Sequence, residues 1–233
     1  MAGTAYRTAL IVGVGSGLSA SLARTFAKAG MKVALAARRA DALKALAAET
    51  GAKAFACDST DRNQVAKLFT GVEAAVGAAD VVVYNASYRT RGPFVELNAD
   101  EVAKSLSVTA FGGFLVAQEA AKRMVPKGHG AILFTGASAS VKGYAQSAPF
   151  AMGKFALRGL AQSMARELQP HGIHVGHVVI DGGICSERRP DPPDKPDSLL
   201  DPDAIAQNYL HLLAQPRSAW AWEIEVRPWV ERF

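Results

Sequence analysis

Gly13, Gly15 and Gly17 lie between an apolar run and an amphipathic run in the segment ALIVGVGSGLSASLARTFAKAG. This arrangement is typical of a strand–turn–helix that binds a dinucleotide, because glycine accepts positive φ and lets backbone amides approach a pyrophosphate. The anion then lies on a helix N-terminus, which carries about half a positive charge. A glycine-rich turn can also serve packing alone, so a nucleotide site is inferred only together with the motifs that follow.

The end of the second apolar run indicates which nucleotide is bound. An acidic side chain at this place hydrogen-bonds a ribose hydroxyl, whereas an arginine pairs with a 2′-phosphate. The sequence here is AARR, ending in Arg38 and Arg39, with no acidic residue. These arginines favour NADP over NAD, the alternative being that they begin a solvated helix.

The order of apolar and amphipathic runs predicts the fold. Runs typical of buried strands occur at 8–13, 32–37, 52–57, 80–84, 131–135 and 173–180. Helical patterns fill most of the gaps, at 17–29, 40–49, 61–76, 99–125, 149–169 and 202–214. This alternation predicts an α/β fold, a doubly wound parallel sheet of the Rossmann type in three layers, α/β/α. Residues 1–233 are expected to form a single NADP-binding domain.

Two further segments follow the sixth strand. Residues 186–203 are rich in Pro and Asp and match neither a helix nor a strand. Too little chain follows them to build another domain, so we expect a loop that serves as a substrate lid. A last strand is expected at 220–227, where Trp220, Trp222, Ile224 and Val226 alternate with other residues and should share one buried face.

Composition limits the classes of function. The net charge is +5 and the pI about 9.3, but the basic residues are scattered, so we expect no nucleic-acid partner. No apolar run approaches the roughly 18 residues of a membrane span. Two cysteines in 233 residues fit a reducing, cytoplasmic setting and a soluble protein. His174 and His177 lie three apart on a strand and point to opposite faces, so no metal site is expected.

Four blocks resemble the short-chain dehydrogenase/reductase family, in that family's order. VGVGSGLS at 12–19 is similar to its TGxxxGxG turn, with Ser19 for the last glycine. ACDSTD at 56–61 is similar to the block whose Asp contacts the adenine, and YNAS at 84–87 to the NNAG block. Lys154 falls at the lysine of the YxxxK motif. The resemblance spans nearly the whole chain.

The resemblance implies a nicotinamide cofactor, here NADP(H), and a small-molecule substrate. It also implies a homodimer or homotetramer formed through the long helices at 99–125 and 149–169. The expected cofactor-binding residues are Gly13, Gly15, Ser16, Gly17, Leu18, Arg38, Arg39, Asp58, Ser59, Asn85, Ala86, Lys154, Gly182 and Ile184.

The resemblance breaks at the family's catalytic tetrad of Asn, Ser, Tyr and Lys. In the family, tyrosine transfers the proton, lysine lowers its pKa and holds the ribose, serine orients the carbonyl, and asparagine holds a water. An ungapped alignment places Thr109, Ala137, Phe150 and Lys154 at these positions. A phenyl ring cannot transfer a proton, so the usual general acid is missing.

Nearby polar residues are candidate substitutes. Ser138 adjoins Ala137 and could orient the acceptor. Tyr144 could replace the missing phenol or be an ordinary loop aromatic. Asp181 follows a strand at the edge where doubly wound sheets bind ligands; it is a candidate acid, with a helix cap or turn as the alternative.

Two other positions border the expected substrate region. Arg89 and Arg91 follow the YNAS block and could hold a carboxylate or phosphate, or be ordinary surface residues. The family threonine that contacts the nicotinamide carboxamide corresponds to Cys185 or, with one extra residue, to Ser186.

The favoured function is hydride transfer between NADP(H) and a small carbonyl, alcohol or imine-like substrate, with a non-standard proton donor. Lys154 would fix the ribose, Ser138 would orient the acceptor, and Tyr144, Asp181 or water would manage the proton. One alternative is a non-catalytic NADP(H)-binding sensor or scaffold that kept the cofactor site. Another is a non-redox enzyme that uses the pocket for isomerisation or elimination.

Overall fold

The apolar runs form one parallel sheet in the computed structural model, which describes residues 6–187 and 189–231. The strands are β1 (Thr8–Val12), β2 (Lys32–Ala37), β3 (Lys53–Ala56), β4 (Val81–Tyr84), β5 (Gly130–Thr135), β6 (Ile173–Ile180) and β7 (Glu223–Val226). Every residue of β1, β4, β5 and β6 is buried. Burial on both faces explains why these strands are largely apolar and show no alternation of apolar and polar residues.

The strand order is β3-β2-β1-β4-β5-β6-β7, with all neighbouring pairs parallel. The chain therefore runs outward from β1 to β3, then crosses back to place β4 on the other side of β1. Val12 at the end of β1 pairs with Ala36 on one side and Tyr84 on the other. Such a reversal opens a crevice at the carboxyl ends of the strands, where ligands bind in this class of fold.

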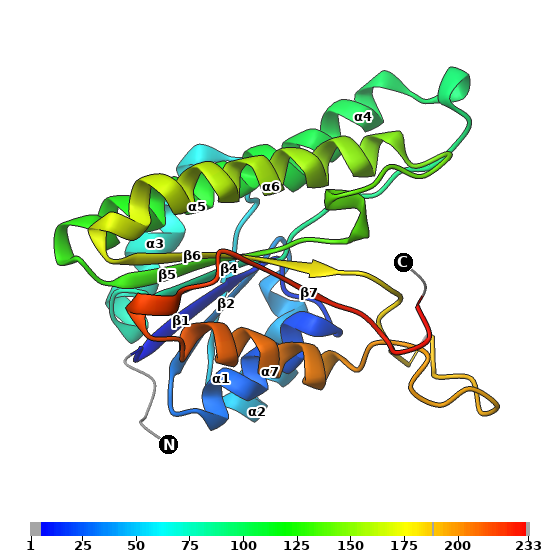
Figure 1. Cartoon of the computed structure of the whole chain (residues 1–233). Helices are drawn as coiled ribbons and strands as arrows, with labels where there is room; N and C mark the ends of the chain where they lie inside the picture. The colour runs from blue at the N-terminus through cyan, green and yellow to red at the C-terminus, as the bar shows by residue number, and fades with distance from the viewer. Residues whose placement is uncertain (1–5, 188, 232–233) are drawn as a thin grey trace.

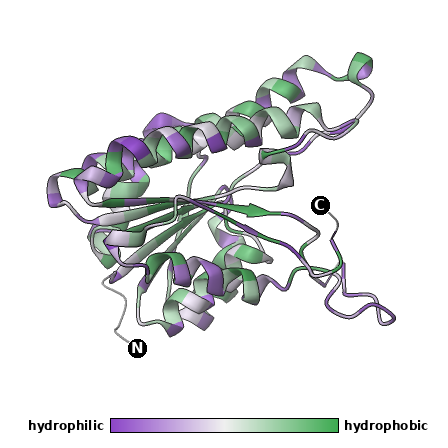
Figure 2. Ribbon diagram, in the orientation of Figure 1, coloured by the Kyte–Doolittle hydropathy of each residue, from purple (hydrophilic) through white to green (hydrophobic). Residues whose placement is uncertain are grey.

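Helices cover both faces of the sheet (Figure 1). One layer contains α1 (Leu18–Lys28), α2 (Lys44–Thr50) and α7 (Pro202–Leu213); the other contains α3 (Arg62–Val76), α4 (Ala99–Leu106), α5 (Gly112–Met124) and α6 (Ala148–Leu168). Each layer encloses its own apolar core against the sheet. Figure 2 shows the strands as the most hydrophobic part of the molecule, with hydrophilic residues toward the outside of the helices. The predicted single doubly wound domain is confirmed.

The helix expected at 99–125 is present from Ala99 to Met124, but a π-helical turn at Ser107–Phe111 lies between α4 and α5. The hydroxyl of buried Tyr84 donates to the carbonyl of Val108 within this turn. Gly112 makes room for that hydroxyl, since a Cβ on it would lie 2.5 Å from the Tyr84 oxygen. The wider turn is thus held open from beneath by a side chain of the sheet.

The last strand is shorter than expected, covering only Glu223–Val226. Ile224 and Val226 pack against the core beneath α1 and α7, whereas Trp222 packs against the core beneath α3, α5 and α6. The prediction that Trp222 shares a face with Ile224 was wrong, because regular pleating begins only after Trp222. Trp220 stacks on the ring of His174, with centroids 4.6 Å apart.

The described residues of the Pro- and Asp-rich segment form a loop beyond the carboxyl edge of the sheet (Figure 1). A bridge between Ile184 and Leu200 ties its two ends together. Within it, the Asp191 carboxylate accepts hydrogen bonds from the backbone amides of Asp197 and Leu199, at 2.5 and 2.9 Å. The segment contains no helix or named strand between Glu187 and Asp201 among the residues described.

From the packing around the π-helical turn we expect two glycine-to-alanine changes to have opposite effects on the free energy of unfolding. Gly112→Ala should lower the free energy of unfolding by about 1–3 kcal/mol, because the added methyl meets the Tyr84 and Ser59 hydroxyls. Gly159→Ala, in α6 with open space around its Cβ position, should raise it by about 0.5–1 kcal/mol. Urea unfolding of both variants measures the difference. Equal effects of the two changes would contradict this account of Gly112.

Candidate active site

A cavity of about 550 Å³ lies where the carboxyl ends of β1, β4, β5 and β6 meet. Its wall comes from five segments: the turn after β1, the loops after β4, β5 and β6, and the first turns of α6. The strand order brings these segments together although they are spread over more than half of the chain.

The turn after β1 presents backbone to the cavity. Gly13 has φ +88°, and a Cβ there would lie 2.3 Å from the amide nitrogen of Ala86. Gly15 and Gly17 have nothing within 4 Å of a Cβ position, so the turn leaves space for a ligand. The N-cap of α1 is Gly17, which supplies no side-chain acceptor to the first amides of the helix. Gly13, Gly15, Gly17 and Leu18 line the cavity, and Ser16 lies exposed on the same turn.

A hydrogen-bond chain joins this turn to the loop after β4. The Asn85 amide donates to the Ser19 hydroxyl at 2.6 Å, and that hydroxyl donates to the Gly13 carbonyl at 3.1 Å. Ser19, the residue at the last glycine position of the family turn, thus fixes the distance between the two loops. Asn85 lines the cavity, and Ala86 packs on Gly13 behind it.

The residues expected to select the cofactor lie at the same sheet edge, outside the cavity wall. Arg38 and Arg39 directly follow β2 and are exposed. Asp41 is the first acidic residue after the strand, and it forms an ion pair with Lys44 at 2.6 Å. The exposed guanidinium groups of Arg38 and Arg39 are therefore available to bind a substituent on the ribose of a nucleotide beyond the end of β2.

Asp58 and Ser59 have different surroundings. The Asp58 carboxylate accepts from the amide and hydroxyl of Thr60, at 2.9 and 2.8 Å, and is partly exposed. Ser59 is buried, and its hydroxyl hydrogen-bonds the Tyr84 hydroxyl at 3.1 Å beneath the π-helical turn. Its position is that of a core residue supporting Tyr84.

Lys154 is the buried cation of the cavity. Its side chain is almost completely enclosed, and Nζ donates to the carbonyl oxygen of Thr135 at 2.7 Å. Burial without an acidic partner lowers the pKa of Lys154 to about 8. The Phe150 ring, one helical turn earlier, lines the cavity with its centroid 5.7 Å from Nζ. The wall at this point is a cation beside an aromatic face.

The loop after β5 supplies Ala137 and Ser138 to the cavity wall. The Ala137 amide donates to the Ser140 hydroxyl at 3.1 Å, which turns the loop toward α6. Thr109 is fully buried behind the wall, where its hydroxyl accepts from the amide of Tyr88 at 3.2 Å. Ser138 is therefore the hydroxyl that the structure brings to the cavity beside Ala137.

Tyr144 and Asp181 are not brought to the cavity. Tyr144 is 47% exposed and outside the cavity wall. Asp181 is buried beside two cations: Lys142 Nζ at 3.3 Å and Arg227 Nη2 at 3.6 Å from its carboxylate. Asp181 is thus an ion-pair partner of two cations, and neither Asp181 nor Tyr144 is in the wall of the cavity.

Gly182 and Ile184, after β6, line the cavity. Gly182 has φ +151°, and a Cβ there would lie 2.8 Å from the ring of Pro228. Cys185 and Ser186 continue into the loop and are not in the wall; the Cys185 amide donates to the Leu200 carbonyl at 2.8 Å. The backbone around Gly182 is thus one surface that this loop offers to a ligand.

Sequence reasoning missed a buried network behind the loop after β5. His177 Nδ1 lies 2.9 Å from Glu223 Oε2, and Arg158 binds the same carboxylate through two contacts of 2.6 and 2.7 Å. The Ser140 hydroxyl lies 3.5 Å from His177 Nε2. Burial lowers the pKa of His177 to about 4, so the ring is neutral at neutral pH. The pairing register of β6 with β7, which places His177 beside Glu223, would have revealed this network.

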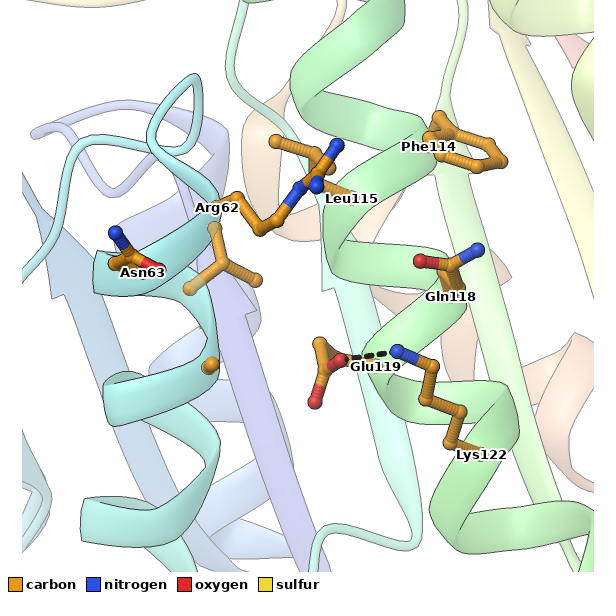
Figure 3. A pocket seen from close by; sticks show the side chains of 9 residues that line it. Arg62, Asn63, Phe114, Leu115, Gln118, Glu119 and Lys122 are labelled. Atoms are coloured by element: carbon orange, nitrogen blue, oxygen red, sulfur yellow. Dashed lines mark hydrogen bonds and ion pairs between the residues drawn. The ribbon is translucent and has the colours of Figure 1, made fainter.

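A second cavity, of about 540 Å³, lies between α3 and α5 (Figure 3). Its wall includes Arg62 and Asn63 from α3, and Phe114 from α5. Glu119 and Lys122 pair with each other at 2.7 Å at its side. The described residues that line this cavity belong to two neighbouring helices, whereas the first cavity lies where the strand order reverses and the loops after four strands meet, so we place the active site in the first cavity.

In the part of the chain that the structure describes, no three His, Cys, Asp or Glu side chains gather as a metal site would require. Over the same residues, no helix has both the length and the apolar character of a membrane span.

Comparison with known proteins identifies the family. The model of the family described as short chain dehydrogenase matches residues 7–189, and the chain belongs to this family. The Escherichia coli cyclic-di-GMP-binding biofilm dispersal mediator protein is 37% identical over 189 residues, which cover 79% of this chain and 76% of that protein. D-threitol dehydrogenase from Mycolicibacterium smegmatis is 29% identical over 177 residues, covering 74% and 68% of the two chains.

Solved structures agree with this assignment. A short-chain dehydrogenase from Rhodopseudomonas palustris superposes with a TM-score of 0.83 at 33% identity, covering 96% of this chain and 99% of the other. A metagenomic short-chain oxidoreductase in complex with NADP superposes with a TM-score of 0.82 at 28% identity, covering 95% and 97%. The protein is thus a short-chain oxidoreductase by family, with a Rossmann-type fold.

Titration of Lys154 should make stability depend on pH. Burial lowers its pKa from 10.5 to about 8 in the folded protein. Between these values the unfolded chain binds a proton that the folded protein does not, so the contribution of Lys154 to the free energy of unfolding rises with pH. The rise is about 3 kcal/mol across this window. Lys154→Met should remove it.

Urea unfolding at about pH 7.5 and about pH 10 measures this contribution as the difference between wild type and variant. Lys127→Met, at an exposed lysine, is the matched control and should follow wild type. Parallel pH dependence of wild type and Lys154→Met would show that Lys154 does not titrate in this range.

Proposed function

We propose that the protein transfers a hydride between NADP(H) and a small carbonyl, alcohol or imine-like substrate, using a non-standard proton donor. The observation that carries the proposal is the buried Lys154 ammonium, which faces the same cavity as the open glycine turn. The NADP complex of the metagenomic relative supports the choice of cofactor.

The residues present fit a dinucleotide. The space beside Gly15 and Gly17, with the N-terminus of α1 behind it, suits a pyrophosphate. Lys154 would hold the nicotinamide ribose, and the backbone near Gly182 would face the carboxamide. Arg38 would pair with the 2′-phosphate, with Arg39 and Asp58 beside the adenosine. When bound, the cofactor supplies the hydride.

The proton must come from a group other than a phenol. Phe150 stands one turn before Lys154, at the tyrosine position of the family motif, and has no proton to give. Ser138 would orient the acceptor from the opposite loop. With a pKa of about 8, Lys154 is protonated at neutral pH and close to the range in which general acids work best. We therefore assign the proton to Lys154, directly or through a water.

The proposal includes a homodimer or homotetramer in the cytoplasm. The outer surfaces of the π-helical turn, α5 and α6 carry exposed apolar side chains: Phe111 at 45%, Phe114 at 40%, Met152 at 48% and Phe155 at 45% exposure. Phe111 and Phe114 stack on each other at 6.2 Å. An apolar surface of this kind is typical of a subunit interface. Both cysteines are free thiols, which suits a reducing compartment.

A non-catalytic ligand-binding role is the second candidate. It is favoured by the name of the Escherichia coli relative, a cyclic-di-GMP-binding protein, together with the phenyl ring at position 150. In that case the protein binds NADPH or a cyclic dinucleotide but does not oxidise NADPH with a panel of carbonyl compounds. Turnover in that assay supports the oxidoreductase.

Cofactor choice is tested at Arg38. Arg38→Ala should weaken NADPH binding by about 1.5–3 kcal/mol, the range for a hydrogen bond to a charged group. NADH binding should stay nearly unchanged, because NADH has no 2′-phosphate. Calorimetry with both cofactors makes NADH the internal control. Equal losses for the two cofactors would refute the role of Arg38.

The missing phenol is tested by restoring it. Phe150→Tyr combined with Ala137→Ser should raise ketone reduction by NADPH about a hundredfold to ten-thousandfold, the worth of a positioned general acid. Lys154, one helical turn away, would lower the pKa of the new phenol. Phe155→Tyr on the exposed side of α6 is the control, since it adds a phenol outside the cavity. Circular dichroism checks folding. If the wild-type protein reduced the ketone as fast as the folded double variant, the phenyl ring at position 150 would not limit the rate of reduction.

A further inference from the structure

The charged side chains in the wall of the active-site cavity are all cationic. They are Arg89 and Arg91 from the loop after β4, Lys154 from α6, and Arg189 from the loop after β6. No Asp or Glu is in the wall among the residues that the structure describes. Like charges around one cavity raise its positive potential and favour an anionic ligand.

The position of Arg89 is fixed by the residue before it. The Tyr88 amide donates to Thr109 Oγ1 at 3.2 Å, and the Tyr88 carbonyl accepts from Ser105 Oγ at 2.9 Å. The Tyr88 hydroxyl donates to Glu101 at 2.5 Å. Three hydrogen bonds to α4 and the π-helical turn therefore hold the backbone from which Arg89 reaches the cavity.

The Arg89 guanidinium lies over the Phe150 ring, 4.8 Å from its centroid. A stacked guanidinium keeps its N–H groups in its own plane, free for an acceptor at the ring edge. Partial burial and the nearby charge of Arg91 lower the pKa of Arg89. A ligand anion would relieve that repulsion.

Arg189 reaches the cavity from the loop after β6. A Cβ on Gly183 would lie 2.3 Å from its Nη1, so the guanidinium packs directly on the Gly183 backbone. The amide and carbonyl of Arg189 pair with those of Ser186, at 2.9 and 3.0 Å, in a tight turn. The Pro- and Asp-rich loop thereby contributes one cation to the cavity.

We propose that the substrate carries an oxyanion, a carboxylate or a phosphate, which Arg89 binds at the edge of Phe150 with support from Arg91 and Arg189. The inference rests on the proposed function, because it concerns the acceptor end of the same cavity. The cofactor pyrophosphate does not account for these arginines, since its cradle is the N-terminus of α1 whereas Arg89 packs on α6.

Binding is tested with small probes on the protein saturated with NADP⁺. Oxalate is a planar dianion, oxamide is its neutral counterpart, and inorganic phosphate represents the other oxyanion. Calorimetry should detect binding of oxalate or phosphate but no binding of oxamide. Tighter binding of oxalate would indicate a carboxylate substrate, and tighter binding of phosphate would indicate a phosphorylated one. Arg89→Gln should weaken the anion about tenfold to a hundredfold and leave NADP⁺ affinity unchanged. Arg166→Gln, an exposed arginine at the far end of α6, should bind like wild type.

Kinetics separate this inference from the proposed function. With NADPH, pyruvate should be reduced with a higher kcat/KM than its methyl ester, and Arg89→Gln should lower kcat/KM for the acid only. Anion binding that depends on Arg89, without any turnover, would support the oxyanion site and refute the oxidoreductase. Turnover of acid and ester alike, unaffected by Arg89→Gln, would overturn the oxyanion site alone. Oxamide binding as well as oxalate would also overturn it.

Discussion

The reversal of strand order at β1 is the constraint on which the rest of the structure depends. Because β4 returns to the side of β1 opposite β2, the backbone leaving β1 meets the backbone leaving β4 at a single point. Gly13 and Ala86 touch there, and Ser19 and Asn85 lock the two loops together. Any ligand that uses the amides of the first turn is therefore held against the loop that carries Arg89.

A second layer of interactions supports the side chains of the cavity from behind. Glu223 on the edge strand binds both His177 of β6 and Arg158 of α6, the helix that carries Phe150 and Lys154. The network joins the sheet to this helix one turn beyond Lys154. Since His177 is neutral, the Arg158 guanidinium balances the Glu223 carboxylate, and burial of the ion pair costs less than burial of a lone charge.

Much of the fold could be predicted from the sequence, because strands buried on both faces produce largely apolar runs, of which β4 is the clearest. The π-helical turn could not, since its cause, the hydroxyl of Tyr84, is distant in sequence and adjacent only in the folded sheet. The glycine turn and Lys154 were found from local motifs. Arg189 and the surroundings of Asp181 were missed for the same reason as the turn: the loop after β6 takes its position from tertiary contacts.

The residues that hold the π-helical turn in place are different from the residues that line the cavity. Tyr84, Ser59 and Gly112 hold the turn from within the core, and none of them lies in the cavity wall. The side chains at positions 137 and 150 carry none of that support. The inner surface can therefore exchange its reactive groups while the framework keeps its shape, which makes this chain a suitable scaffold for installing new reactions by substitution at a few wall positions.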